Sequence, residues 1–155
     1  MNTLKVAVLA VVVIFFGLST NSGTAAEFGT AAEAKALVEK AAAFWHENGR
    51  DKALAAFNDR NGAFVDRDLY VVAANLSDGV RIAHGFNSRM IGKSLADFKD
   101  IEGKAYGLEI LDLARTAGSG WVDYKFTNPV TRKIMDKTSY VLKVDDVVIF
   151  SGAYK

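Results

Sequence analysis

The sequence contains no cysteine, a single proline and only two histidines among its 155 residues. Without cysteine, disulfides cannot hold the fold, and thiolate metal sites and a covalently attached c-type haem are excluded. His46 and His84 are far apart in the sequence and lack the paired spacing of a zinc-binding helix. We therefore expect no metal and no other cofactor.

An excess of charge of either sign is also missing. Lysine and arginine number 19 and aspartate and glutamate 18, a formal net charge of +1. Proteins that bind nucleic acid usually carry a clustered basic face. We therefore expect no nucleic-acid partner.

The sequence has only one long apolar run, at residues 6–18. Lys5 precedes it and the small residues 24–26 follow it, the pattern of a secretory signal peptide. The run is shorter than the roughly 20 residues that span a bilayer. We therefore expect a signal peptide at residues 1–26, one domain at residues 27–155, a periplasmic or secreted location, and no stable membrane anchor after cleavage.

Catalytic signatures are scarce as well. The only Gly-Ser-Gly motif, at residues 118–120, precedes an expected strand, whereas phosphate-binding loops open a helix. Asp66 and Asp68 have the spacing of paired carboxylates on one strand face, although solvated charges at a strand edge are the simpler interpretation. We therefore expect a binding protein and not an enzyme.

The stretch from residue 64 to residue 93 contains the clearest pattern, a β-hairpin. Residues 69–76 are rich in apolar and β-branched side chains, residues 77–79 form a Ser-Asp-Gly turn, and residues 80–86 return. Strict alternation places His84 beside Ile82 on one face of the second strand and Arg81 on the other face. His84 therefore lies in a row of apolar side chains, which forms either core or the wall of a pocket.

The other elements follow from periodicity and capping residues. Thr30 and Glu33 form a capping box for a helix that ends at Asn48-Gly49. A second short helix, capped by Asp51, reaches residue 58. Further along we expect a helix at residues 104–117 and strands at residues 121–127, 136–144 and 147–154. This order predicts an α+β, PAS-like fold: a five-stranded antiparallel sheet with a long N-terminal helix and helices on the connections.

Two stretches, LYVVAANLSDGVRIAHGFNSRMIGKSL and GSGWVDYKFTNPVTRKIMDKTSYV, resemble the single Cache domain, second type, of bacterial extracytoplasmic sensors. The resemblance implies a small organic acid as ligand, such as acetate, propionate, pyruvate or lactate. Because the sequence ends directly after the last expected strand, we expect any signal to pass to a separate membrane sensor or transport partner.

Aromatic and cationic residues within these stretches are our candidates for ligand contact. Lysine and tyrosine donate to a carboxylate, and aromatic rings exclude water from a short apolar tail. Each candidate residue also has a plainer interpretation. The aromatic residues can be core residues, His84 a buried histidine bonded to the backbone, and Lys137 an exposed strand lysine. The candidates are Tyr70, His84, Trp121, Tyr124, Lys137 and Tyr140.

Two other functions remain open from the residues alone. The first is an interaction module without a pocket, which would show a filled core and an exposed apolar patch. The second is a small enzyme of cystatin-like or NTF2-like shape, with His84 or Asp68 as general base. A buried pocket lined by Lys137 and aromatic residues would favour ligand binding instead.

Overall fold

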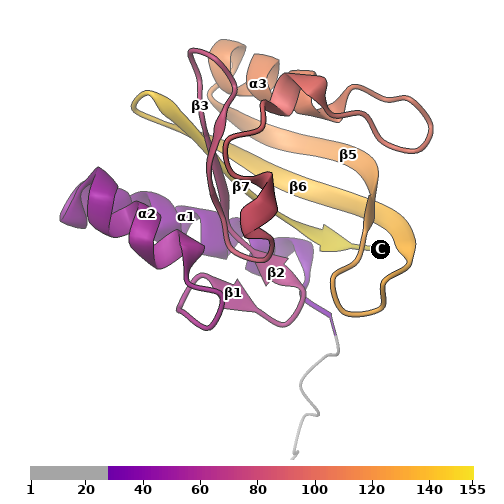
Figure 1. The fold of residues 1–155 in the computed structure, drawn as a ribbon, viewed down its shortest axis with the longest axis horizontal. Coiled ribbons are helices and arrows are strands. Elements are labelled where there is room, and N and C mark those ends of the chain that lie inside the picture. Colours follow the sequence, from indigo (N-terminus) through magenta and orange to yellow (C-terminus); the bar gives the residue numbers. More distant parts are fainter. Residues whose placement is uncertain (1–27) are drawn as a thin grey trace, which may run out of the picture.

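A five-stranded antiparallel sheet separates two sets of helices in the computed structural model, which describes residues 28–155 (Figure 1). The strand order is β4-β3-β7-β6-β5, so the strand latest in the sequence lies in the centre. The predicted α+β, PAS-like fold is confirmed. The strands are β3 (Val72–Asn75), β4 (Arg81–His84), β5 (Ser119–Thr127), β6 (Ile134–Val144) and β7 (Val147–Tyr154).

The expected signal peptide, residues 1–26, lies outside the described residues. Along residues 28–155, no helix is both long and apolar enough to cross a membrane. The same part of the chain holds no group of three or more His, Asp or Glu side chains placed to bind a metal ion.

One face of the sheet is covered by α1 (Ala31–Asn48) and α2 (Arg50–Asn58). The capping box predicted for α1 is present, because the Thr30 hydroxyl accepts from the Glu33 amide and the Glu33 carboxylate accepts from the Thr30 amide. Asp51 does not cap α2 as predicted: Gly49 occupies that position and Asp51 lies in the first turn.

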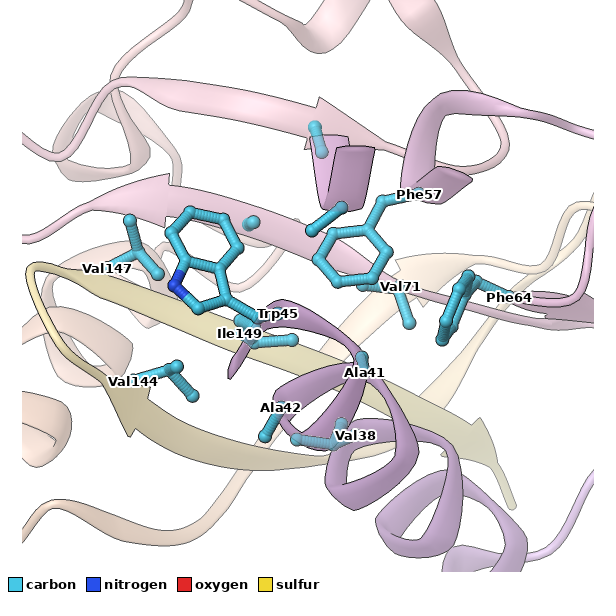
Figure 2. Close-up of a cluster of buried hydrophobic side chains, with 13 residues drawn as sticks. Val38, Ala41, Ala42, Trp45, Phe57, Phe64, Val71, Val144, Val147 and Ile149 are labelled. Carbon is cyan, nitrogen blue, oxygen red and sulfur yellow. The ribbon is translucent and has the colours of Figure 1, made fainter. Parts of the chain in front are cut away.

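The helix α1 packs its apolar stripe onto the sheet as expected (Figure 2). Trp45 and Val38 contact a cluster that includes Ile149 of β7, and Phe57 of α2 packs edge-on against Phe64 at a centroid distance of 4.8 Å. Close packing of this kind is the main source of stability in a domain without disulfides.

The predicted strand at residues 69–76 is divided in two. Its first part, β2 (Leu69–Tyr70), pairs with β1 (Val65–Asp66) in a separate two-stranded sheet, and only β3 joins the main sheet. Between them, the Val71 amide donates to the Phe64 carbonyl in register with the β1–β2 pairing, and the Val71 carbonyl accepts from the Gly85 amide in register with the β3–β4 pairing. The backbone therefore changes partners at this residue, which apolar composition alone does not predict.

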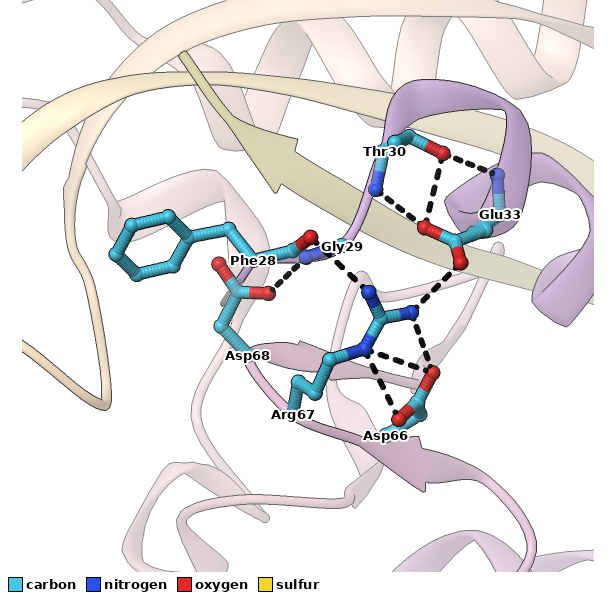
Figure 3. Close-up of polar contacts among 7 residues, drawn as sticks. All are labelled: Phe28, Gly29, Thr30, Glu33, Asp66, Arg67 and Asp68. Atoms are coloured by element: carbon cyan, nitrogen blue, oxygen red, sulfur yellow. Dashed lines mark hydrogen bonds and ion pairs between the residues drawn. The ribbon is translucent and has the colours of Figure 1, made fainter. Parts of the chain in front are cut away.

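Polar contacts tie the start of the described chain to the β1–β2 hairpin (Figure 3). The Arg67 guanidinium lies 2.7 Å from carboxylate oxygens of both Glu33 and Asp66, and also donates to the Phe28 carbonyl. Buried Asp68 accepts from the Gly29 amide at 2.7 Å. Asp66 and Asp68 therefore have different partners and structural roles, unlike a shared pair of catalytic carboxylates.

The opposite face of the sheet is covered by α3 (Tyr106–Thr116) and two short 3-10 helices, η1 (Ser88–Met90) and η2 (Leu95–Asp97). Figure 1 shows α3 on the side opposite α1 and α2, with the segment that carries η1 crossing in front of the strands. This face buries aromatic rings together with polar side chains. The candidate site lies here.

Candidate functional site

An irregularity between β3 and β4 brings two basic side chains to the same face. Val72 pairs with His84 and Ala73 with Ala83, but Ala74 pairs with Arg81, so Ile82 is an extra residue on β4. A bulge of this kind interrupts strict alternation. Our prediction that Arg81 and His84 face opposite sides is therefore wrong. Both line one cavity.

Lys137 of β6 is the most unusual residue in this region because it is a buried cation, 3% exposed. Its ammonium donates to the hydroxyl of Tyr70 at 3.0 Å and to that of Tyr154 at 3.3 Å, and lies over both rings. Tyr154 in turn donates to the Thr127 carbonyl. Burial lowers the pKa of Lys137 to about 7, although the charge of nearby Asp68 partly opposes the shift.

The neighbours of Lys137 leave a defined space for its stem. Gly152 of β7 lies beside it, and a Cβ added there would come within 2.8 Å of the Lys137 Cε atom. Across the adjacent strand pair, Ser139 shares a 2.9 Å hydrogen bond with the hydroxyl of Tyr124. The absence of a side chain at residue 152 therefore allows a lysine to lie against the sheet.

These residues enclose a small space, which we call the inner cavity, of about 20 Å³. That is room for about one water molecule. Among the described residues, the only two buried side-chain polar atoms without a hydrogen-bond partner are Arg81 Nη1 and Ser151 Oγ. Arg81 lines this cavity with its side chain, whereas Ser151 pairs with Tyr140 and directs its hydroxyl to the α1 face. The lining consists of Tyr70, Val72, Arg81, His84, Met90, Tyr106, Tyr124, Phe126, Lys137, Phe150, Ser151 and Gly152.

The cavity has basic but no acidic residues in its lining. Burial, with the charges of Lys137 and Arg81, lowers the pKa of His84 to about 3, so the ring is neutral near pH 7. Its Nδ1 accepts from the amides of Phe86 and Asn87, and the ring stacks on Tyr70 at 5.0 Å. Burial also lowers the pKa of Arg81. Chemically, the cavity suits a small anion.

Two of the six candidates do not reach the cavity. Trp121 and Tyr140 pair across β5 and β6 on the face that α1 covers, with ring centroids 5.1 Å apart. Trp121 is 44% exposed there. Each is three residues from a cavity residue on its own strand, and an odd separation reverses the face. The structure brings together Tyr70, His84, Tyr124 and Lys137 and leaves these two out.

A second space adjoins the inner cavity and shares Tyr70, His84, Met90 and Phe126 with it. This outer chamber measures about 290 Å³. Its remaining lining comes from Phe86 and Asn87, from Thr127 at the end of β5, and from Pro129 and Arg132 in the loop between β5 and β6. The shared side chains form the boundary between the two spaces, and flexible Met90 is the one that moves most easily.

Sequence reasoning missed Arg81 and Tyr154. No composition signal marks the bulge that turns Arg81 inward. Tyr154 could have been predicted from the sequence. The tight Asp145-Asp146 turn fixes the register of the last two strands and places Lys137 opposite Tyr154.

Comparison with known proteins identifies the family and the fold. The family Single Cache domain 2 matches residues 24–155. A periplasmic sensor domain of a chemotaxis protein is 26% identical, with a TM-score of 0.61 over 80% of this chain and 89% of that one. A methyl-accepting chemotaxis protein from Vibrio parahaemolyticus RIMD 2210633 is 21% identical, with a TM-score of 0.66 over 79% and 86% of the two chains.

A third structure, a Cache chemosensory domain described for carboxylic acid recognition, is 23% identical, with a TM-score of 0.60 over 80% of this chain and 87% of that one. No curated protein matches the chain significantly. The family match covers all of the described residues, and the neighbouring structures share the fold. The chain therefore belongs to the single Cache domain family of the second type.

Proposed function

We propose that this chain is an extracytoplasmic binding domain for a short organic carboxylate, and that it signals through a separate membrane sensor or transport partner. Membership of the Cache family supports a sensing role, and the similar structures include periplasmic sensor domains of chemotaxis proteins. The signal-peptide pattern at residues 1–26 supports export. On this proposal the chain is not an enzyme.

One observation carries the proposal: Lys137 is a buried lysine at the inner cavity whose hydrogen bonds go to tyrosine hydroxyls and not to a carboxylate. Burying a cation without an acidic partner is costly. A carboxylate in the cavity would supply that partner, and Arg81 Nη1 would add a second donor. The Tyr70 and Phe126 rings would pack against a short tail.

The test is calorimetry with acetate, propionate, pyruvate and lactate on the wild-type protein and on Lys137→Met. A charge-assisted contact contributes roughly 1.5–3 kcal/mol, so the variant should bind about ten- to a hundredfold more weakly. Its free energy of unfolding should rise, because methionine buries the same stem without the cost of a buried charge. Lys143→Met, on the exposed part of the same strand, is the matched control and should leave affinity unchanged.

The pH dependence provides an independent check. The pKa of Lys137 is about 7 in the free protein, and a bound carboxylate raises it. Binding therefore takes up protons above pH 7, and affinity should fall by up to about tenfold per pH unit there. If the four acids bind equally well to Lys137→Met, or if affinity is flat from pH 6 to 9, the proposed function is wrong.

A further inference from the structure

The outer chamber opens beside a surface hollow of about 370 Å³, with which it shares Phe86, Asn87 and Arg132. We call this the arginine hollow, because its charged lining residues are Arg60, Arg89 and Arg132. No acidic residue lines the hollow, the chamber or the inner cavity. The arginine hollow, the outer chamber and the inner cavity therefore adjoin one another in that order, with basic and no acidic residues in their linings.

The three arginines of the hollow differ in their ion pairing from the lysines that line another groove on the molecule. Within residues 28–155, none of the three forms an ion pair with a carboxylate. In a groove elsewhere on the molecule, by contrast, Lys125 pairs with Asp136 at 2.8 Å and Lys155 with Asp123 at 3.3 Å. The arginine hollow therefore has unmatched positive charge facing a concave surface.

Arg132 is the arginine that reaches the outer chamber, and its loop is stiffly built. Its backbone has φ +62°, a conformation costly for a residue with a side chain. The side-chain oxygen of buried Asn128 accepts from the amides of Val130 and Thr131, and its amide nitrogen donates to buried Asp68. The hydrogen bonds of buried Asn128 therefore fix the conformation of the loop that carries Arg132.

The sizes of the two spaces limit how a ligand can lie. The inner cavity holds about 20 Å³, so a carboxylate that contacts Lys137 must leave the rest of its molecule in the outer chamber. The walls there are apolar at Phe86, Met90, Phe126 and Pro129, and the charged group is Arg132. Apolar walls accommodate a carbon chain, and a guanidinium binds a carboxylate with two parallel hydrogen bonds.

We propose that the ligand is a dicarboxylate: one carboxylate binds at Lys137 and Arg81, the carbon chain crosses the outer chamber, and the second carboxylate binds at Arg132. This inference rests on the proposed function and specifies its ligand class. The arginine hollow supplies Arg60 and Arg89 as further positive charges near the second carboxylate.

The experiment compares acids of equal chain length by calorimetry: butyrate with succinate, pentanoate with glutarate, and hexanoate with adipate. In the wild-type protein, at least one dicarboxylate should bind about tenfold more tightly than its monocarboxylate partner. Arg132→Gln should remove most of that advantage. Lys133→Gln removes the same charge from the next position, outside the chamber lining, and should preserve the advantage.

Arg132→Gly separates binding from folding. Glycine adopts a positive φ without strain, so this variant should be at least as stable as the wild-type protein and still lose the dicarboxylate advantage. Equal affinity for the members of every pair, with both lost in Lys137→Met, would overturn the dicarboxylate inference and leave the proposed function standing. If no acid binds the wild-type protein, both fail. If Lys133→Gln and Arg132→Gln lose the dicarboxylate advantage equally, the advantage comes from the overall positive charge of the region. That result would overturn the role of Arg132.

Discussion

The two faces of the same sheet are each covered by helices, but they bury different kinds of side chain. Under α1 and α2 the sheet buries apolar residues such as Trp45, Phe57 and Ile149 and no ionisable group, with the Ser151 hydroxyl beside them. Under α3 and η1 the sheet buries Arg81, His84, Lys137 and Ser139 among aromatic rings. Successive residues of one strand face opposite sides, so β7 contributes to both environments.

The α1 face therefore contributes mainly to the stability of this small domain, and the other face holds the candidate binding site. Burial of apolar surface on the α1 face favours folding, whereas buried ionisable groups on the other face oppose it. Both His84 and Lys137 have lowered pKa values because burial disfavours their charged forms. Perturbed groups of this kind gather where a protein binds or reacts. The predictions below test whether the two faces differ as the structure indicates.

The largest effect should come from acid. The pKa of His84 is about 3 when folded, against an ordinary value of 6.5, so the folded state binds fewer protons between these pH values. Stability is therefore lost as pH falls from 6.5 to 3, by up to about 5 kcal/mol. Urea unfolding across this range should show a flatter profile for His84→Asn, in which the amide oxygen takes the place of Nδ1. His46→Asn, at the exposed end of α1, is the control and should keep the wild-type profile. Matching profiles for His84→Asn and wild type would contradict the prediction.

A truncation on the apolar face should rank next. Phe57 is fully buried against Phe64, and Phe57→Ala should lower the free energy of unfolding by about 3–5 kcal/mol, because the cavity cannot be refilled. Phe86, half-buried at the outer chamber, is the counterpart on the other face, and Phe86→Ala should cost less than half as much. Denaturant titration of both variants measures the difference. Equal losses would show that the two faces contribute equally to stability.

The smallest effect should come from Trp121. Its side chain lies on the α1 face and is about half exposed, so Trp121→Ala should cost about 1 kcal/mol of stability. Carboxylate affinity should be unchanged, because the residue does not line the inner cavity. Calorimetry on this variant is a direct check of the face assignment. A loss of carboxylate affinity in this variant would show that Trp121 belongs to the binding site after all.

The sequence predicted the elements well because local signals specify them. The Thr30 capping box, the Asn48-Gly49 helix end and the Asp145-Asp146 turn each have a short-range physical cause, and each is found. The candidate site was predicted only in part. Alternation with correct counting would have removed Trp121 and Tyr140, since each lies an odd number of residues from a cavity residue on its strand.

Arg81 and Arg132 could not have been found from the sequence in the same way. The inward position of Arg81 depends on one extra residue in β4, and bulges of this kind have no reliable composition signal. Arg132 reaches the chamber because Asn128 bonds to Asp68, a contact between residues 60 positions apart. Contacts over such separations depend on the assembled fold and not on local patterns.

The central place of β7 has a consequence for how the chain acquires its structure. Within the sheet, the β3–β4 pair and the β5–β6 pair are joined by backbone hydrogen bonds only through β7, which is the latest strand in the sequence. During synthesis the sheet cannot close until residues 147–154 are available, and pairings of high sequence separation form slowly. The chain therefore stays open until late. An export machinery that threads unfolded polypeptide would then have time to act before this domain folds.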